Sequence, residues 1–324
     1  MKKIIGVFSF VVLAMSCSKT AINEEMMKPE ENLNASVAHR ECASQQVLEA
    51  NLQADPGLAA RMQSIEDATA YFAANPTTNY TSNGIVYIPV VVNVLYKTAA
   101  ENVSLAQIQS QIDVLNADFS AANSDIGSIP ASFQGVQAGD AGIRFVLDQV
   151  IRKVTSKSSW RTDDAMKKSS RGGIDPTSPS TKMNMWCCTM SGGILGYAQF
   201  PGGSAATDGI VITNTTFGVT TAGAPYNKGR TATHEVGHYL NLRHIWGDAT
   251  CGNDFVGDTP LHNGANYGCP ASGARSSCSG TPVMMTMNYM DYTNDLCMYM
   301  FSAGQKTRMN ATFASGGGRT SLAL

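Results

Sequence analysis

The sequence has little charge, and neither sign is in excess. Charged residues make up 15% of the 324 residues, and the formal net charge is −2. A basic face of the kind that binds nucleic acid is therefore not expected. The apolar run at residues 4–14 is also too short to cross a bilayer, for which about 20 residues are needed.

Histidine is scarce, which makes its distribution informative. The chain has five histidines, and His234, His238 and His244 all fall within residues 231–248. His234 and His238 are four residues apart, so on an α-helix their imidazoles share one face. Glu235 lies between them. This H-E-x-x-H pattern is typical of zinc hydrolases, in which two ring nitrogens bind the metal and the carboxylate acts on a water molecule.

His244 is the predicted third zinc ligand. It cannot reach the same metal from a continuous helix, so the chain must first turn through a left-handed conformation. Asn241 stands at that point, and asparagine is the next best residue after glycine for this geometry. The alternative is a different zinc hydrolase whose third ligand is a downstream glutamate, and the position of His244 argues against it.

These residues resemble the extended zinc motif of the metzincin metallopeptidases, H-E-x-x-H-x-x-G-x-x-H, with Asn241 in place of the glycine. The stretches HEVGHYLNLRHIWGD, CGNDFVGDTP, NYMDY and LCMYMFSAGQKTRM are similar to the pappalysin family of metzincins, especially its bacterial branch of cytophagalysin- and ulilysin-like enzymes. Upstream matches at residues 88–96, 107–119 and 193–203 extend the resemblance over roughly residues 84–309.

The resemblance implies an α+β fold, a metzincin-like catalytic domain in two subdomains. The N-terminal subdomain, to about residue 244, would hold a twisted mixed β-sheet with active-site and backing helices. The C-terminal subdomain, residues 245–324, would be loop-rich and stapled by disulfides.

Residue patterns place the elements of this fold. Apolar runs predict strands at residues 85–96, 143–151, 183–188, 194–200 and 209–213. A capping box at Ser104 opens a predicted helix, and residues 153–180 are expected to form a polar surface loop. The predicted core face of that helix consists of Leu105, Ile108, Ile112, Leu115 and Phe119.

The resemblance also implies roles around the metal. Met290 would be the methionine below it, and Tyr292 would help to stabilise the developing oxyanion. The edge strand above the cleft, where an extended peptide can pair, would consist of Gly196, Tyr197 and Ala198. Asp291 and Asp295 follow the methionine, and a carboxylate at the pocket floor would favour Arg or Lys after the scissile bond.

Eight cysteines in a chain with few charges favour an oxidising compartment. Four of them lie in the Gly-, Asn- and Ser-rich C-terminal region, where three disulfide pairings are open and no C-x-x-C spacing suggests zinc. The family pattern implies Cys251–Cys278 and Cys269–Cys297. Cys187 and Cys188 receive no role.

Two further features lie in the C-terminal region. Asp254, Asp258 and Thr259 offer clustered oxygen ligands in a glycine-containing loop, which suits a structural calcium ion. His262 matches no functional role and is expected at the surface.

The N-terminal residues predict export and latency. Residues 1–17 have the charged start and apolar run of a signal peptide, and the small residues before Cys17 resemble a bacterial lipobox, with Cys17 lipidated. Ordinary secretory cleavage is the alternative. Residues 18–60 are interpreted as a tether and prosegment, and residues 61–324 as the metallopeptidase domain. Cys42 is the candidate thiolate that blocks the zinc until the prosegment is removed.

The sequence therefore predicts an exported zinc endopeptidase, made as a latent zymogen, with protein or peptide substrates and with Glu235 as general base. It would meet a membrane only through an N-terminal lipid anchor, as an outer-membrane or cell-surface lipoprotein, or be secreted after prosegment cleavage. The alternative is a non-enzymatic surface lipoprotein or binding module that retains a zinc site. The sequence does not indicate the oligomeric state.

Overall fold

Five strands form one mixed sheet in the order β2-β1-β3-β5-β4. The first four of these run parallel, and β4 closes one edge antiparallel to β5. The strands are β1 (Val86–Tyr96), β2 (Ile143–Val154), β3 (Met183–Cys188), β4 (Gly196–Ala198) and β5 (Ile210–Thr213). The mixed sheet and the edge position of β4 confirm the expected α+β architecture.

The protein is described by a computed structural model, which covers Met1 and residues 39–75 and 84–322. Its helices are α1 (Ser44–Ala54), α2 (Leu58–Ala74), α3 (Leu105–Phe119), α4 (Ala131–Gln134), α5 (Arg230–Tyr239) and α6 (Ala303–Ala311). Contacts divide the chain into residues 1–36 and residues 37–324, and the second unit holds all of these elements. Cys17, the predicted signal peptide and most of the tether lie outside the described residues.

One face of the sheet is covered by α3 and α5. The side chains of Ile108, Ile112, Leu115 and Phe119 are all buried there, as their helical spacing predicts. Leu105 was expected on the same face but is 60% exposed. The Ser104 hydroxyl accepts the amide hydrogen of Gln107, so Leu105 is the first helical residue and points away from the core.

Residues 153–180 were expected to form a polar surface loop, but part of this segment covers the other face of the sheet. These residues do not form a simple surface loop, because Trp160, Met166 and Lys167 are buried against Trp186 and Tyr197 of the sheet. The Lys167 ammonium bonds the Asp164 carboxylate at 2.9 Å and the carbonyl of Thr207, so its charge is compensated. The polar composition of this segment therefore did not indicate that it covers the sheet.

The region after residue 244 has little regular structure apart from α6. Its disulfides are Cys251–Cys278 and Cys269–Cys297, the pairing that the resemblance implies. Cys187 and Cys188 on β3 are free, buried thiols. None of the described helices combines the length and apolarity that crossing a membrane requires.

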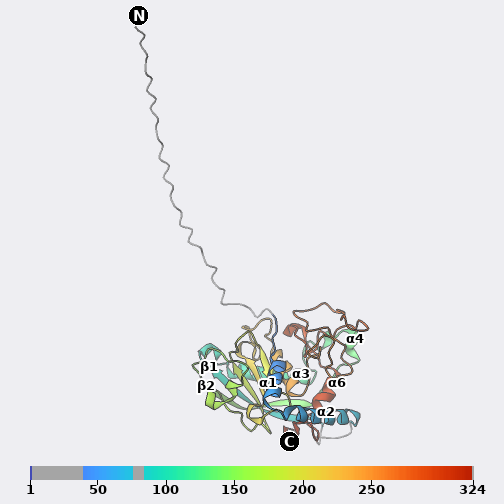
Figure 1. The fold of residues 1–324 in the computed structure, drawn as a ribbon, viewed down its shortest axis with the longest axis horizontal. Helices are drawn as coiled ribbons and strands as arrows, with labels where there is room; N and C mark the ends of the chain where they lie inside the picture. Colours follow the sequence, from blue (N-terminus) through green and yellow to red (C-terminus); the bar gives the residue numbers. More distant parts are fainter. Residues whose placement is uncertain (2–38, 76–83, 323–324) are drawn as a thin grey trace. The chain divides into compact units, whose positions relative to one another are not determined.

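The two N-terminal helices lie against the rest of this unit. A short break at residues 55–57 separates α1 from α2, as the Asp-Pro-Gly sequence predicts. Helix α1 packs near β4, and α2 lies against α6 (Figure 1). Leu48, Leu58 and Met62 from these helices bury Phe200, which follows β4.

Candidate metal centre

Helix α5 and the turn after it present the three histidines in the interior of the protein. All ten of its residues are buried, and His234 and His238 lie one turn apart on it. The helix ends before Asn241, whose φ of 71° is left-handed. This turn brings His244 back beside the other two rings, as predicted from the sequence.

The three imidazoles converge through Nε2. The Nε2 atom of His238 lies 3.2 Å from that of His234 and 3.1 Å from that of His244. The Nδ1 of His234 donates to the carbonyl of Tyr289 at 2.7 Å, and the Nδ1 of His238 to the carbonyl of Leu242 at 2.8 Å. Since carbonyls only accept, the Nε2 atoms of these two rings carry lone pairs that point at the same place.

This arrangement fits zinc. Burial, together with the neighbouring histidines, holds the pKa values of His234 and His238 well below the usual range, so both rings are neutral ligands. The Cys42 sulfur and one nitrogen of each histidine all lie within 4.8 Å of one another. Three imidazoles and a thiolate are a donor set that zinc prefers.

Met290 and Tyr292 lie beside α5 and the three histidine rings. Met290 is fully buried beneath α5 at Gly237, where a Cβ atom would come within 2.4 Å of the methionine sulfur. Glycine at this position therefore allows the contact. The Tyr292 ring packs near His234 and His244, and its hydroxyl donates to the carbonyl of Cys42 at 3.1 Å.

The Glu235 carboxylate is buried beside Cys42 and Ser44. Its Oε2 accepts the Ser44 hydroxyl at 2.9 Å and lies 3.4 Å from the Cys42 sulfur. Burial raises the pKa of Glu235 to about 7. A Cβ atom on Gly196 would come within 3.0 Å of the Glu235 side chain, so this glycine lets β4 pass directly over the carboxylate.

Residues 41–44 lie along β4 in parallel orientation. Leu195 donates its amide hydrogen to the carbonyl of Glu41 at 2.9 Å, and Ala43 donates to the carbonyl of Gly196 at 3.1 Å. The amide of Ala198 donates to the Ser44 hydroxyl at 2.8 Å. The segment before α1 therefore occupies the edge that was predicted to bind substrate, whereas Tyr197 points its side chain to Asp164 on the far side.

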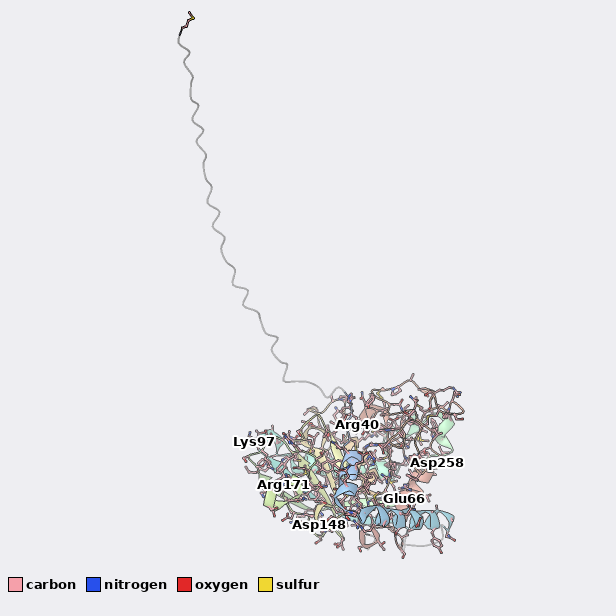
Figure 2. The ribbon with its side chains drawn as sticks, in the orientation of Figure 1. Arg40, Glu66, Lys97, Asp148, Arg171 and Asp258 are labelled. Atoms are coloured by element: carbon pink, nitrogen blue, oxygen red, sulfur yellow. A yellow bond between two sulfur atoms is a disulfide. The ribbon has the colours of Figure 1, made fainter. Side chains whose placement is uncertain are left out.

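A second buried contact holds the same segment two residues before Cys42. The Arg40 guanidinium is 1% exposed and pairs with the buried Asp295 carboxylate at 2.6 Å. It also lies over the Tyr226 ring and bonds the Thr293 carbonyl. Arg40 forms no ion pair with Asp291 among the described residues, and Asn266 and the amide of Tyr292 hold the Asp291 oxygens. Figure 2 shows Arg40 close to the start of α1.

The residues predicted to bind calcium have other partners in the structure. Asp254 accepts hydrogen bonds from the Thr259 hydroxyl at 2.8 Å and the amide of Val256. Asp258 accepts the Ser302 hydroxyl at 2.6 Å and the amide of Gly304, at the start of α6.

The expectation for His262 was wrong. Its side chain is fully buried, and its Nε2 accepts the amide hydrogen of Met285 at 3.0 Å. An isolated histidine without motif context gives no sequence signal for burial. Here it satisfies a buried backbone donor.

Four residues at the site were not singled out from the sequence as functional: Arg40, Ser44, Glu66 and Asp248. The Asp248 carboxylate contacts Nδ1 of His244. Its position four residues after a predicted ligand was the available signal, since ligating histidines commonly donate their second nitrogen to a carboxylate. Arg40 and Ser44 flank Cys42 by two residues on either side, which also could have drawn notice.

Comparisons with known proteins identify the family of this chain. The family profile Peptidase_M43, described as Pregnancy-associated plasma protein-A, matches residues 183–314. An extracellular metalloprotease of Pyricularia oryzae is 31% identical over 96% of this chain and 96% of its own length. Another, from Coccidioides posadasii, is 39% identical over 52% of this chain and 62% of its own length.

Solved structures of mirolysin from Tannerella forsythia are also similar. A promirolysin mutant superposes with a TM-score of 0.79 and 38% identity, covering 88% of this chain and 97% of that one. Mature mirolysin in complex with a cleaved peptide gives a TM-score of 0.71 and 42% identity, covering 74% of this chain and 96% of that one. The chain belongs to the pappalysin family of metzincins and is a zinc metalloendopeptidase.

Proposed function

We propose that the protein is an exported zinc endopeptidase held latent by its own N-terminal segment, with Glu235 as general base. The observation that carries this proposal is the position of the Glu235 carboxylate, 3.4 Å from a sulfur that shares one small space with three histidine nitrogens. A base must lie within reach of the reacting water, and this carboxylate would lie beside a water molecule that took the place of the Cys42 sulfur.

His234, His238 and His244 would hold the zinc ion through Nε2. Zinc in such a site polarises the peptide carbonyl and lowers the pKa of water toward about 7. Glu235 accepts the proton of the attacking water molecule and then delivers it to the leaving amine. The pKa of this carboxyl, raised to about 7 by burial, suits a group that both takes and returns a proton.

Tyr292 and β4 position the substrate in this proposal. The Tyr292 hydroxyl now donates to the Cys42 carbonyl at 3.1 Å. Once the segment leaves, the same donor is free to stabilise the oxyanion that forms from the scissile carbonyl. The backbone of Gly196 and the amide of Ala198 then pair with an extended substrate, because residues 41–44 no longer use them.

Latency follows from Cys42. Its thiolate would take the fourth zinc position and exclude water from it. Burial and the nearby Glu235 carboxylate raise the pKa of the Cys42 thiol in the zinc-free site. The Cys42 thiolate is therefore stable in this buried site only when a cation compensates its charge. Cys42 would thus block the site when zinc is bound there.

The prosegment in this proposal includes both α1 and α2. Promirolysin matches 88% of this chain, whereas mature mirolysin matches 74%. The difference of 14% of 324 residues corresponds to about 45 residues. Residues 39–83 have that length. We therefore place the end of the prosegment between α2 and β1 rather than at residue 60.

The Asp295 pocket is proposed to receive Arg or Lys at the residue after the scissile bond. In the latent chain Arg40 occupies it, and its guanidinium makes charge-assisted bonds with Asp295. A substrate arginine would make the same contacts. A peptide-library cleavage profile without enrichment of basic residues at this position would reject the assignment.

Export is supported by the relatives named extracellular metalloproteases and by the signal-like residues 1–16. We propose lipidation of Cys17 as an anchor to the outer membrane or cell surface. Replacing Cys17 by Ser should release the protein into the soluble fraction of the producing bacterium. Equal membrane retention of both forms would exclude the anchor.

A structural calcium ion near Asp254, Asp258 and Thr259 is a further proposal. It is supported by two carboxylates and a hydroxyl in one loop, and by burial that raises the pKa of Asp254 to about 6. Calcium should raise the melting temperature of the wild type but not of Asp254→Asn. An equal effect of calcium on both proteins would exclude a site at Asp254.

A direct assay tests the proposed activity. Full-length protein activated by limited proteolysis should hydrolyse casein or a quenched peptide. A zinc chelator should abolish this hydrolysis, and added Zn²⁺ should restore it. Hydrolysis that persists in the chelated protein would reject the zinc mechanism.

A further inference from the structure

We propose that Arg243 and Arg308 form a carboxylate-binding subsite on the side of the cleft opposite Asp295. Glu66 fills this subsite in the latent chain, and an acidic side chain N-terminal to the scissile bond fills it after activation. The inference rests on the proposed function, which it deepens by adding a substrate preference.

Glu66 on α2 binds Arg308 on α6 in a bidentate ion pair. Its Oε2 accepts from Nη1 of Arg308 at 2.7 Å, and its Oε1 accepts from Nη2. Oε1 also lies 3.2 Å from the side-chain nitrogen of Asn241. Figure 2 shows Glu66 on the α2 ribbon, so this carboxylate belongs to the proposed prosegment.

Arg308 is fixed independently of Glu66. Its Nε donates to the carbonyl of Asn241 at 2.7 Å, in the turn between His238 and His244. The guanidinium is 4% exposed. Among the described residues Glu66 is the only carboxylate that forms an ion pair with it. Loss of α2 would therefore remove this ion pair and leave the Arg308 guanidinium held at the Asn241 carbonyl, in the turn between two predicted zinc ligands.

Arg243 adds a second cation to the same place. Its guanidinium lies over the Phe200 ring at 4.5 Å, and its Nε atom is buried with no hydrogen-bond partner among the described residues. Phe200 in turn lies 5.3 Å from the His238 ring. Burial and Arg308 lower the pKa of Arg243, whereas Glu66 and Asp248 oppose this effect. The two guanidinium groups thus already act on each other and on Glu66.

The course of the prosegment indicates which part of a substrate reaches this subsite. Arg40 lies in the Asp295 pocket on one side of Cys42, and α1 and α2 follow Cys42 on the other side, over Phe200. A substrate with its basic residue in the Asp295 pocket extends the residues before the scissile bond toward Phe200. An Asp or Glu there would meet Arg243 and Arg308.

The expected preference follows from charge. With α2 gone, two neighbouring guanidinium groups repel each other, and a carboxylate relieves this repulsion while accepting hydrogen bonds from both. A glutamine of equal size accepts a hydrogen bond but carries no charge. The partly buried site should discriminate between them by about tenfold, and salt should reduce the difference.

The test compares peptides that differ only in Glu or Gln at each of the four positions before the scissile bond. The full-length chain, activated by limited proteolysis, should cleave one Glu peptide with a kcat/KM about tenfold above its Gln partner, mainly through KM. Arg243→Gln and Arg308→Gln should each bring this ratio close to one. Arg144→Gln, on the opposite sheet edge and paired with Asp140, should keep the wild-type ratio.

A second measurement needs no turnover. The Kd of a fluorescent Glu or Gln peptide for activated chain carrying Glu235→Ala should show the same ratio and the same response to Arg243→Gln. A ratio of one at all four positions in wild type, by both measurements, would overturn the subsite, and so would a ratio that neither Arg variant changes. Failure of the proposed function is distinct, because it abolishes hydrolysis of every peptide and leaves the Kd comparison intact.

Discussion

The carboxylate of Asp248 contacts Nδ1 of His244, the one predicted zinc ligand whose second nitrogen faces a charge. His234 and His238 use backbone carbonyls for the same purpose. Asp248 has a φ of 57°, a left-handed conformation that aspartate adopts more readily than most residues other than glycine. The Trp246 ring stacks on the face of the His244 ring at 4.4 Å. Asp248 and Trp246 together fix the orientation of the third ring.

Asp248→Asn should weaken zinc binding. The amide keeps the shape of the side chain but removes the negative charge that faces Nδ1 of His244 and fixes the ring, so the affinity should fall by about 10- to 100-fold. Competition with a chromophoric zinc chelator measures this. Asp113→Asn on the exposed face of α3 serves as the control and should leave the affinity unchanged. An unaltered affinity in Asp248→Asn would contradict the orienting role.

Cys42→Ala should give the full-length chain partial peptidase activity before any processing. The variant loses the proposed zinc–thiolate bond, while Arg40 and the β4 pairing of residues 41–44 still hold the segment. Peptide hydrolysis before any processing should therefore rise by at least about tenfold over wild type, without reaching the activated level. Cys187→Ala, another free buried cysteine, is the matched control. If both variants stay as inactive as wild type, Cys42 is not the block.

Asp295→Asn should reduce the preference for a basic residue after the scissile bond. The carboxylate also accepts the amides of Lys228 and Arg230 at the start of α5, and an amide oxygen retains these bonds. The ratio of kcat/KM between an Arg and a norleucine peptide should drop by about 10-fold or more, because a charged partner of the guanidinium is lost, worth roughly 1.5–3 kcal/mol. A ratio equal to wild type would exclude Asp295 from the pocket.

The buried His262 should lower the free energy of unfolding at acid pH. Burial lowers its pKa to about 4, against an ordinary value of about 6.5. Below pH 6.5 the unfolded chain takes up a proton that the folded chain refuses, so the free energy of unfolding falls until pH 4, by up to about 3 kcal/mol.

The observable is the difference in unfolding free energy between wild type and His262→Gln. Between pH 7 and pH 4, the free energy of unfolding of wild type should fall by up to about 3 kcal/mol more than that of His262→Gln. Asp291, 3.6 Å away with a pKa raised to about 7, contributes the opposite slope, and the comparison with His262→Gln largely removes that contribution. Parallel curves for the two proteins would show that His262 titrates normally.

The sequence predicted the elements with strong periodicity and the residues inside motifs. Strand 85–96 and the helix with Ile108, Ile112 and Leu115 follow from local pattern alone, and three histidines at ligand spacing define the centre. The prediction for residues 153–180 was wrong because Trp160 and Met166 are isolated apolar residues in a polar stretch, and only tertiary contact shows that they bury.

Long-range partners could not be predicted for the same reason. Arg40 meets Asp295 across 255 positions, and Glu66 meets Arg308 across 242. Each charge taken alone is typical of a solvated surface residue. Only the fold brings Arg40 and Glu66 onto Asp295 and Arg308, so these contacts became visible in the structure alone.

The central claim is that three histidines hold zinc while Glu235 performs the proton transfer. Glu235→Ala separates these roles, because it leaves all three rings and their Nδ1 partners in place. Activated wild type and variant should each contain one zinc per chain by elemental analysis, and the variant should hydrolyse a quenched peptide at least about 1,000-fold more slowly. A zinc-loaded variant with wild-type turnover, or a wild type that hydrolyses without zinc, would contradict the account.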